Sequence, residues 1–140
     1  WEYAAKAGTQ TEAYWGDDLD LACEYANIGD RVARKQYRWI IWHNCKDGAV
    51  VSNKVGSYKP NQFGLYDMLG NVWEWTCSEF TETYGGAEKR CASAGNTAKR
   101  VDRGGGWGNG PRYVRSAIRS RVSRDFRRYD LGFRLIRTNR

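Results

Sequence analysis

Histidine is almost absent from this sequence. His43 is the one histidine among 140 residues, and the four cysteines contain no Cys-x-x-Cys pair. Structural zinc sites are usually built on such pairs, and non-haem iron sites need two histidines and a carboxylate. This chain alone therefore completes neither site in the usual way. We expect His43, in "RWIIWHN", to be a structural side chain, and ligation of a metal is the minor alternative.

Proline and long apolar runs are also scarce. With 2 prolines, 41% hydrophobic residues and 14% aromatic residues, the composition argues against disorder and for one domain with a sizeable core. No run approaches the roughly 20 apolar residues of a membrane-spanning helix, and we expect no signal peptide. It opens on Trp1 without a methionine, from which we expect a processed or truncated piece. "GGGWGNG" lacks both the Lys-Ser/Thr of a phosphate loop and the G-x-G-x-x-G spacing of a dinucleotide site.

Positive charge is concentrated at the C-terminal end. Residues 1–98 carry 10 Lys/Arg against 13 Asp/Glu, whereas residues 99–140 carry 13 against 3. Such asymmetry is typical of a surface for nucleic acid or an acidic partner. An equally weighted alternative is that many of these arginines donate hydrogen bonds to backbone carbonyls within a loop-rich fold.

The cysteines indicate disulfide bonds. An even number of cysteines in a loop-rich chain favours two bridges and an oxidising compartment, such as a periplasm or cell surface. Pairing of Cys23 with Cys45 and of Cys77 with Cys91 is one of three connectivities. Four buried free thiols, compatible with a cytoplasmic protein, remain the alternative.

Regular secondary structure is expected to be sparse. "WEYAAKAG" predicts the end of a helix with Gly8 as its stop, and "RWIIWHN" has the strongest strand propensity. "AVVS" and "NVWEWT" are shorter candidate strands. "LGFRLIR" predicts a strand with Leu131, Phe133 and Leu135 facing inward and Arg134 outward. The pattern predicts a single α+β domain dominated by loops.

Loops of this kind need partners for their backbone polar groups, and a bound cation is one solution. In "GLYDMLGNVWEWT", Asp67 and Glu74 supply hard oxygen ligands on either side of a tight turn, and the carbonyls of Gly70 and Val72 lie between them. These ligand types suit Ca²⁺. A second, weaker set combines the segment at Asn27 with "CKDGAV".

Eight motifs in order carry a resemblance to a known family. They are "WEYAAKAG", "YWGDD", "YANIGD", "KDGAV", "VGSYKPNQFGLYDMLGNVWEWT", "RVDRGGGW", "VRSAIRSR" and "LGFRL". Together they resemble the C-terminal part of the formylglycine-generating-enzyme (sulfatase-modifying factor) family. The resemblance implies that residues 1–140 form one domain with a variant of the C-type-lectin-like fold, lacking its N-terminal portion. It also implies two structural calcium sites, Asn27, Ile28, Asp47 and Ala49 in one and Asp67, Gly70, Val72 and Glu74 in the other.

The resemblance also bears on catalysis. The family enzymes bind copper(I) through two cysteines just after the counterpart of "RGGGW", because soft thiolates select that ion. Here Asn109 stands near the first position and Tyr113 or Val114 near the second. We therefore expect no copper and, on balance, no enzyme activity. Formylglycine-type or non-haem-iron oxidation remains open if residues outside this chain complete a site.

Relatives diversified by retroelements offer a closer parallel. Their C-terminal segment alternates fixed residues with positions mutated from AAC codons, and residues 103–135 resemble it, which predicts a variable region that binds a protein or another macromolecule. Nucleic acid is a less favoured partner. The predicted ligand-binding residues are Gly108, Asn109, Gly110, Tyr113, Ile118, Ser120, Val122, Ser123, Phe126, Arg128, Tyr129 and Asp130.

Overall fold

A small mixed sheet and several very short helices account for the regular structure. The computed structural model describes residues 1–38 and 41–137. The helices are α1 (Glu2–Lys6), α2 (Ala22–Tyr25) and α3 (Arg31–Gln36), with the 3-10 turns η1 (Leu19–Leu21) and η2 (Ala87–Lys89). The strands are β1 (Trp73–Glu79), β2 (Arg100–Arg103), β3 (Ser120–Val122) and β4 (Leu131–Phe133). The expectation of mixed helices and strands dominated by loops is confirmed.

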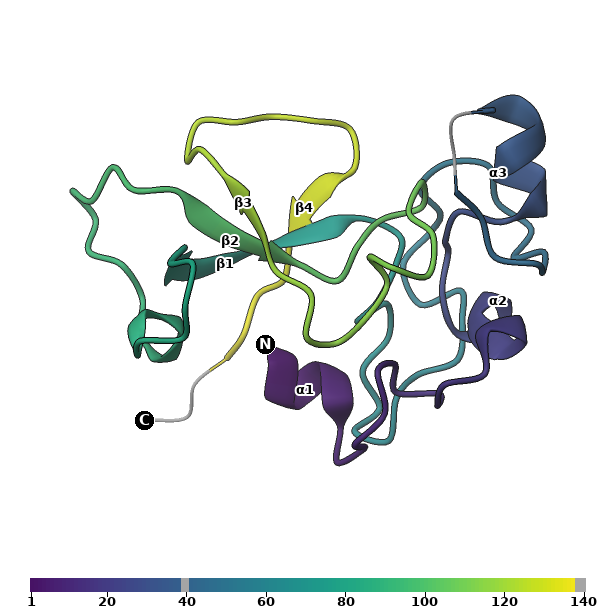
Figure 1. The fold of residues 1–140 in the computed structure, drawn as a ribbon, viewed down its shortest axis with the longest axis horizontal. Helices are drawn as coiled ribbons and strands as arrows, with labels where there is room; N and C mark the ends of the chain where they lie inside the picture. The colour runs from purple at the N-terminus through teal and green to yellow at the C-terminus, as the bar shows by residue number, and fades with distance from the viewer. Residues whose placement is uncertain (39–40, 138–140) are drawn as a thin grey trace.

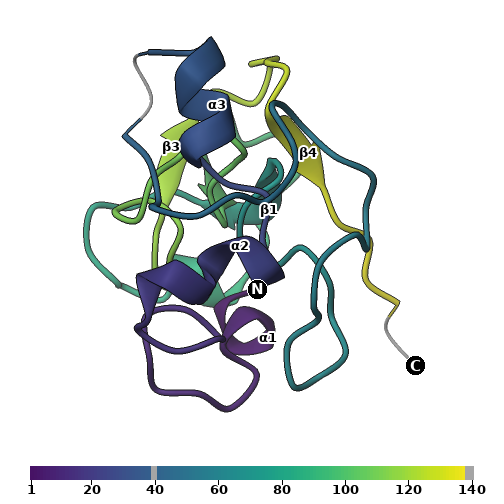
Figure 2. The same cartoon turned by 90° about the vertical axis from the view of Figure 1, so that its right-hand side faces the viewer.

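The sheet has the order β3-β2-β1-β4. β2 pairs antiparallel with both β1 and β3, whereas β4 pairs parallel with β1. In Figure 1, α2 and α3 lie to the right of the sheet and α1 lies below it, and the perpendicular view in Figure 2 has α3 at the top and α1 at the bottom. In the part of the chain that the structure describes, no helix is long and apolar enough to cross a membrane.

The sequence located some elements and missed others. "WEYAAKAG" forms α1, which ends at Ala7 with a left-handed φ of 47°, one residue before Gly8. "NVWEWT" overlaps β1, whose aromatic residues suit a pleated, half-buried strand. "AVVS" is wrong as a strand, because residues 49–52 form an irregular loop. In "RWIIWHN", residues 39 and 40 lie outside the described residues, and residues 41–44 form no strand.

Of the three residues predicted to face inward in "LGFRLIR", Leu131 alone is partly buried. Phe133 and Leu135 are 72% and 86% exposed. Arg134 instead turns inward, and its guanidinium donates to both carboxylate oxygens of Glu74. An alternating pattern predicts a core face only where a sheet is covered on that side, and β4 is an edge strand with β1 as its one neighbour.

A buried asparagine joins four loops next to the sheet. Asn71 accepts hydrogen bonds at Oδ1 from Asn27 Nδ2 (3.0 Å) and from the Asn53 backbone N–H (2.8 Å). Its Nδ2 donates to the Asn53 carbonyl, and its backbone N–H donates to the Asn27 carbonyl. Its own carbonyl accepts from the backbone N–H of Trp107. The turn at Asn71 thus holds segments near residues 27, 53 and 107 against one another.

Two disulfides fasten further loops. Cys23 in α2 is bonded to Cys45, and Cys77 in β1 is bonded to Cys91. The nearest-neighbour connectivity, one of the three considered, is therefore the one found. The first bridge joins α2 to the loop that contains His43, and the second joins β1 to the loop between η2 and β2.

His43 lies in the interior, as a structural side chain would. It is 2% exposed. Burial lowers its pKa to about 4, although the Leu19 carbonyl and the charge of Asp30 favour the protonated form. The imidazole is therefore neutral at pH 7.

Gly70 offers a test of the asparagine-centred turn. A Cβ at this position would lie 2.3 Å from the Asn27 carbonyl oxygen, and φ is 79°. Gly64 has a similar φ of 73° but no atom within 4 Å of an added Cβ. We expect Gly64→Ala to cost about 1 kcal/mol of the free energy of unfolding, from backbone strain alone. Gly70→Ala should cost at least about 3 kcal/mol because it also displaces the Asn27 carbonyl.

Urea denaturation of both variants measures the difference. Equal losses would mean that the close approach of Gly70 to Asn27 contributes nothing to stability.

The second prediction concerns acid. The folded-state pKa of His43 is lowered, so the unfolded chain takes up a proton at this residue between about pH 6.5 and pH 4 and the folded chain does not. His43 should therefore remove about 2 kcal/mol of stability as the pH falls from 7 to 5. Burial raises the pKa of Asp47 to about 6, and raises that of Asp102, which gives the opposite slope. The measurement is consequently the difference in unfolding free energy between the wild type and His43→Gln, which should shrink toward low pH. A constant difference would contradict the lowered pKa.

Candidate ligand-binding surface and cation sites

The predicted ligand-binding positions occupy the loops around β3 and the approach to β4. Tyr113, Phe126 and Tyr129 are exposed at 43%, 44% and 74%, and Ser123 is exposed as well. Gly108, Ile118, Ser120, Arg128 and Asp130 are partly exposed.

Ring contacts extend from the loop before β4 to α3. The Tyr129 ring packs on Trp107 at a centroid distance of 5.8 Å, and Trp107 packs on Tyr37 at 5.3 Å. Trp107 is buried, and it forms a small core cluster with Ala33 of α3. The solvent-exposed Tyr129 ring thus packs on the buried ring of Trp107. We call the exposed side chains Tyr113, Phe126 and Tyr129 the aromatic surface.

Three of the predicted positions face inward instead. Asn109 Oδ1 accepts hydrogen bonds from Trp73 Nε1 (2.7 Å) and from the Gly106 backbone N–H (2.8 Å). Gly110 is buried, and a Cβ there would lie 2.1 Å from the Ile41 carbonyl oxygen. Val122 is 7% exposed. These residues hold the loops and present little surface to a ligand.

Arg128 is anchored between two carboxylates. Its Nη2 lies 3.2 Å from Asp102 Oδ2, and its Nε lies 2.6 Å from Asp130 Oδ1. Asp102 is completely buried, and burial raises its pKa against the effects of Ser120 and Arg128. The guanidinium also lies over the rings of Trp73 and Phe126. Arg128 therefore fixes the loop beneath Phe126.

Many of the C-terminal arginines do bond to backbone carbonyls, as one of the two sequence interpretations proposed. Arg103 donates to the carbonyls of Ala117 and Ile118. The same holds, each with carbonyls of its own, for Arg100, Arg115, Arg119, Arg127 and Arg134. Much of the concentrated positive charge therefore satisfies loop backbone.

The four residues of the second predicted calcium site line one cavity of about 460 Å³. Asp67 is 8% exposed; its Oδ2 accepts from the Gly56 backbone N–H, and its Oδ1 has no partner among the described residues. The backbone carbonyls of Gly70 and Val72 could supply further oxygens. Glu74 already accepts from Arg134 and, at 2.7 Å, from Trp1 Nε1. The unpaired carboxylate oxygen of Asp67 fits a hard cation, and Glu74 would share its oxygens with Arg134.

The first predicted calcium site is occupied by internal hydrogen bonds. The carboxylate of Asp47 accepts from the backbone N–H groups of Ile28 (2.7 Å) and Ala49 (2.8 Å). The Asn27 side chain donates to the Val51 carbonyl and to Asn71. The four residues lie close together, but none of their carboxylate oxygens lacks a partner.

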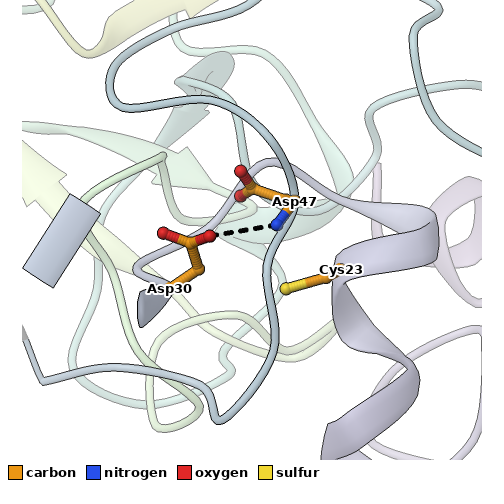
Figure 3. A group of neighbouring side chains, drawn as sticks. All are labelled: Cys23, Asp30 and Asp47. Atoms are coloured by element: carbon orange, nitrogen blue, oxygen red, sulfur yellow. Dashed lines mark hydrogen bonds between the residues drawn. The ribbon is translucent and has the colours of Figure 1, made fainter. Parts of the chain in front are cut away.

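A cluster of Cys23, Asp30 and Asp47 lies beside this site, with one potential ligand atom of each within 4.8 Å of the others (Figure 3). Cys23 is in a disulfide, so it offers no thiolate. Asp30 caps α3 by accepting from the backbone N–H groups of Val32 and Ala33, and its other oxygen accepts from the Asp47 N–H. The cluster therefore serves the backbone. Asp30 was missed by the sequence analysis, although an aspartate directly before a helix is a standard capping signal.

No cysteine thiol is available in the described chain, because all four cysteines are in disulfides. Val114, at the second position expected for a copper ligand, is 3% exposed and belongs to the main core cluster.

Comparisons with known proteins agree with this architecture. The family model for the sulfatase-modifying factor enzyme 1-like domain matches residues 1–139. The formylglycine-generating enzyme of Mycobacterium tuberculosis is 36% identical over 97% of this chain and 48% of its own length. That of Streptomyces coelicolor is 37% identical over 96% of this chain and 43% of its own length.

Two solved structures are also similar. Treponema denticola variable protein 1 has a TM-score of 0.72 and 28% identity, covering 95% of this chain and 43% of that one. PvdO from Pseudomonas aeruginosa has a TM-score of 0.75 and 28% identity, covering 94% of this chain and 47% of that one. The chain thus spans less than half the length of each of these four relatives. The match over residues 1–139 is nonetheless nearly complete, and the chain belongs to the sulfatase-modifying factor enzyme 1-like family.

Proposed function

We propose that this chain is a non-catalytic ligand-binding module on a C-type-lectin-like scaffold braced by calcium. The main support for this proposal is the set of side chains found at the positions where the family enzymes bind copper(I). Asn109 is hydrogen-bonded to Trp73 there, Val114 is packed in the core, and every cysteine is in a disulfide. The described chain thus lacks the pair of thiolates by which the family enzymes bind copper(I).

The aromatic surface supports a binding role. Exposed tyrosines and phenylalanines contribute much contact area at a small cost in side-chain entropy. Tyr129 rests on Trp107, and the loop of Phe126 is anchored by Arg128. The partner that best fits such a surface is a protein or another macromolecule. Two disulfides favour an extracytoplasmic location, since such bonds persist in oxidising compartments.

Diversification by a retroelement is the finer form of this proposal. The similarity to a variable protein from Treponema denticola supports it. The encoding locus tests it directly: a near-identical repeat of the Arg103–Leu135 coding stretch, with AAC codons at the variable positions and a nearby reverse transcriptase, is the expected result. A locus without a repeat would reject diversification and leave the binding role to be tested separately.

Oxidation is the second candidate function, and the identity of 36–37% to formylglycine-generating enzymes favours it. The two functions differ in a measurable way. Conversion of a peptide cysteine to formylglycine would establish oxidation and overturn the non-catalytic proposal, and stoichiometric copper(I) binding by this chain in a chelator competition would contradict the expected lack of copper. The Streptomyces coelicolor enzyme is the positive control.

The aromatic surface yields the third prediction. The triple variant Tyr113→Ala, Phe126→Ala and Tyr129→Ala should weaken binding of a partner selected from a panel of purified extracellular proteins by at least about thirtyfold. The melting temperature should change little, because these side chains are exposed. Biolayer interferometry measures the first effect and calorimetry the second.

A matched control replaces Phe63, Tyr66 and Tyr84, which are exposed at 48%, 44% and 57%. It should leave the partner's affinity unchanged. A large loss of thermal stability in the first triple variant would instead assign its residues to the core. Tight, salt-sensitive binding of single-stranded nucleic acid would favour the nucleic-acid alternative.

Calcium would act as a structural brace, with Asp67 as its main carboxylate ligand, joined by Glu74 and the carbonyls of Gly70 and Val72. It would neutralise a buried carboxylate oxygen that has no other partner. The first predicted site, Asn27, Ile28, Asp47 and Ala49, is the weaker candidate because Asp47 is already satisfied by backbone N–H groups.

The fourth prediction follows from this brace. Calcium at about 100 times its dissociation constant should add about 2.7 kcal/mol to the free energy of unfolding relative to excess chelator. Asp67→Ala should abolish that increment, and Asp67→Asn should retain part of it because an oxygen ligand remains. Asp125→Ala, at a side chain 87% exposed, is the control. Identical melting curves of the wild type in calcium and in chelator would count against both sites.

A further inference from the structure

A cavity of about 550 Å³ lies between α1, β1 and the loop that carries η2. Its volume is within the range of small-molecule sites in proteins. Among the described residues that line it, none belongs to the aromatic surface or to either proposed cation site. The cavity is therefore separate from the sites considered above.

Aromatic and aliphatic side chains make up much of the cavity wall. Trp75 of β1 is partly exposed, and Tyr84, which is 57% exposed, lines the cavity as well. The buried side chains of Met68 and Val101 also contribute to the wall. Accessible aromatic rings beside buried aliphatic side chains suit the flat, apolar body of a small molecule.

Positive charge is in excess around the cavity. Five cationic side chains line it, against two carboxylates. The cations are Lys89, Arg90, Arg103, Arg119 and Arg134, and the carboxylates are those of Glu2 and Glu88. A concave site lined mainly by one sign of charge concentrates ligands of the opposite sign.

Both carboxylates already have cations beside them. Glu2 Oε2 lies 3.1 Å from Arg103 Nη1. The pKa of Glu88 is lowered by its own backbone N–H and, to a smaller extent, by the charges of Lys89 and Arg119. A cationic ligand would have to compete with these neighbours and would also meet the excess of positive charge. The wall therefore favours an anion.

Three of the cations are available to such an anion. Arg119 Nη2 donates to the Glu82 carbonyl (3.2 Å), and its guanidinium lies over the Tyr84 ring at 4.1 Å. These contacts hold the guanidinium, while its other N–H groups donate to no described residue. Lys89 and Arg90 are exposed, and neither side chain makes a hydrogen bond or an ion pair with the residues that the structure describes.

A guanidinium presents parallel N–H donors that match the two oxygens of a carboxylate. We infer that this cavity binds a small aromatic carboxylate, whose anionic group pairs with Arg119 and whose ring packs on Trp75. Lys89 and Arg90 add attraction for the same negative charge. The site is independent of the proposed ligand-binding surface, so the inference stands if that proposal fails.

The test uses three probes with one ring system and different charge: 2-naphthoate, 2-naphthalenemethanol and 2-naphthylmethylamine. Calorimetry measures their affinities. Indole N–H resonances of the ¹⁵N-labelled chain locate the site, and the Trp75→Phe variant assigns the signal of Trp75. We expect 2-naphthoate to shift that signal in a saturable manner and to bind at least about tenfold more tightly than the alcohol, because the alcohol has no charge for Arg119 to pair with. The amine should not bind.

Two sets of variants separate recognition from folding, at about 0.15 M salt, where charges outside the cavity are screened. Arg119→Gln removes the guanidinium and should weaken 2-naphthoate binding at least about tenfold. The double variant Lys89→Gln and Arg90→Gln changes exposed side chains only. It should leave the melting temperature unchanged and weaken binding about threefold. The matched control, Arg112→Gln with Arg124→Gln, removes the same charge from exposed side chains outside the cavity and should leave the affinity unchanged.

Four results would overturn the inference. Equal affinities for 2-naphthoate and the alcohol would mean that the cavity does not recognise an anion. Unchanged affinity for 2-naphthoate in folded Arg119→Gln or in the double variant would place the carboxylate elsewhere. An equal loss in the control would assign the effect to the charge of the whole chain. No saturable binding of 2-naphthoate would mean that the cavity holds solvent alone.

Discussion

The amide of Asn71 is the constraint on which the loop architecture depends. It is 5% exposed, and its Oδ1, Nδ2, backbone N–H and carbonyl are all hydrogen-bonded to residues 18 to 44 positions away in sequence. Helices and sheets satisfy their backbone by local repetition, but these loops do not repeat. The buried Asn71 side chain has both donors and an acceptor, and it hydrogen-bonds loop groups that no helix or sheet satisfies. Removing it would leave several buried polar groups unsatisfied at once, which is more costly than losing one hydrogen bond.

This constraint explains why so little sheet suffices. The turn at Asn71 leads directly into β1, which pairs with both β2 and β4. The carbonyl of Asn71 accepts a hydrogen bond from the Trp107 backbone N–H, and the Trp107 ring packs against the ring of Tyr129. These contacts therefore connect the buried turn at Asn71 to Tyr129 of the exposed aromatic surface. Arg103 and Arg134 also satisfy loop backbone, because each donates hydrogen bonds to carbonyls of residues outside the strands.

The sequence predicted the family, the sparse secondary structure and the strand at "NVWEWT" because each rests on local or ordered motifs. It also offered the correct disulfide pairing among three. It failed where the answer depends on residues distant in sequence. Arg134 turns inward because Glu74, 60 residues earlier, lies beside it, and the alternation of "LGFRLIR" carries no trace of that pairing. The inward orientation of Asn109 likewise depends on Trp73, 36 residues away. The residues of each proposed calcium site lie near one another, yet their unequal hydrogen bonding was beyond any spacing argument.

Asn109 also bears on the choice between binding and catalysis. A copper(I) site needs a thiolate that is deprotonated and free to contact the metal. At the corresponding place this chain has an amide oxygen held at 2.7 Å from an indole N–H and at 2.8 Å from a backbone N–H, so its hydrogen bonds are committed to the fold. Under the proposed binding function, that loop has no need to stay accessible to a substrate. The neighbouring loop surface is then constrained only by the requirement that Trp107, Arg128 and Asn109 remain in place beneath it. That arrangement favours a fixed scaffold with side chains such as Tyr113, Phe126 and Tyr129 directed to solvent, where their identity can change without altering the buried network.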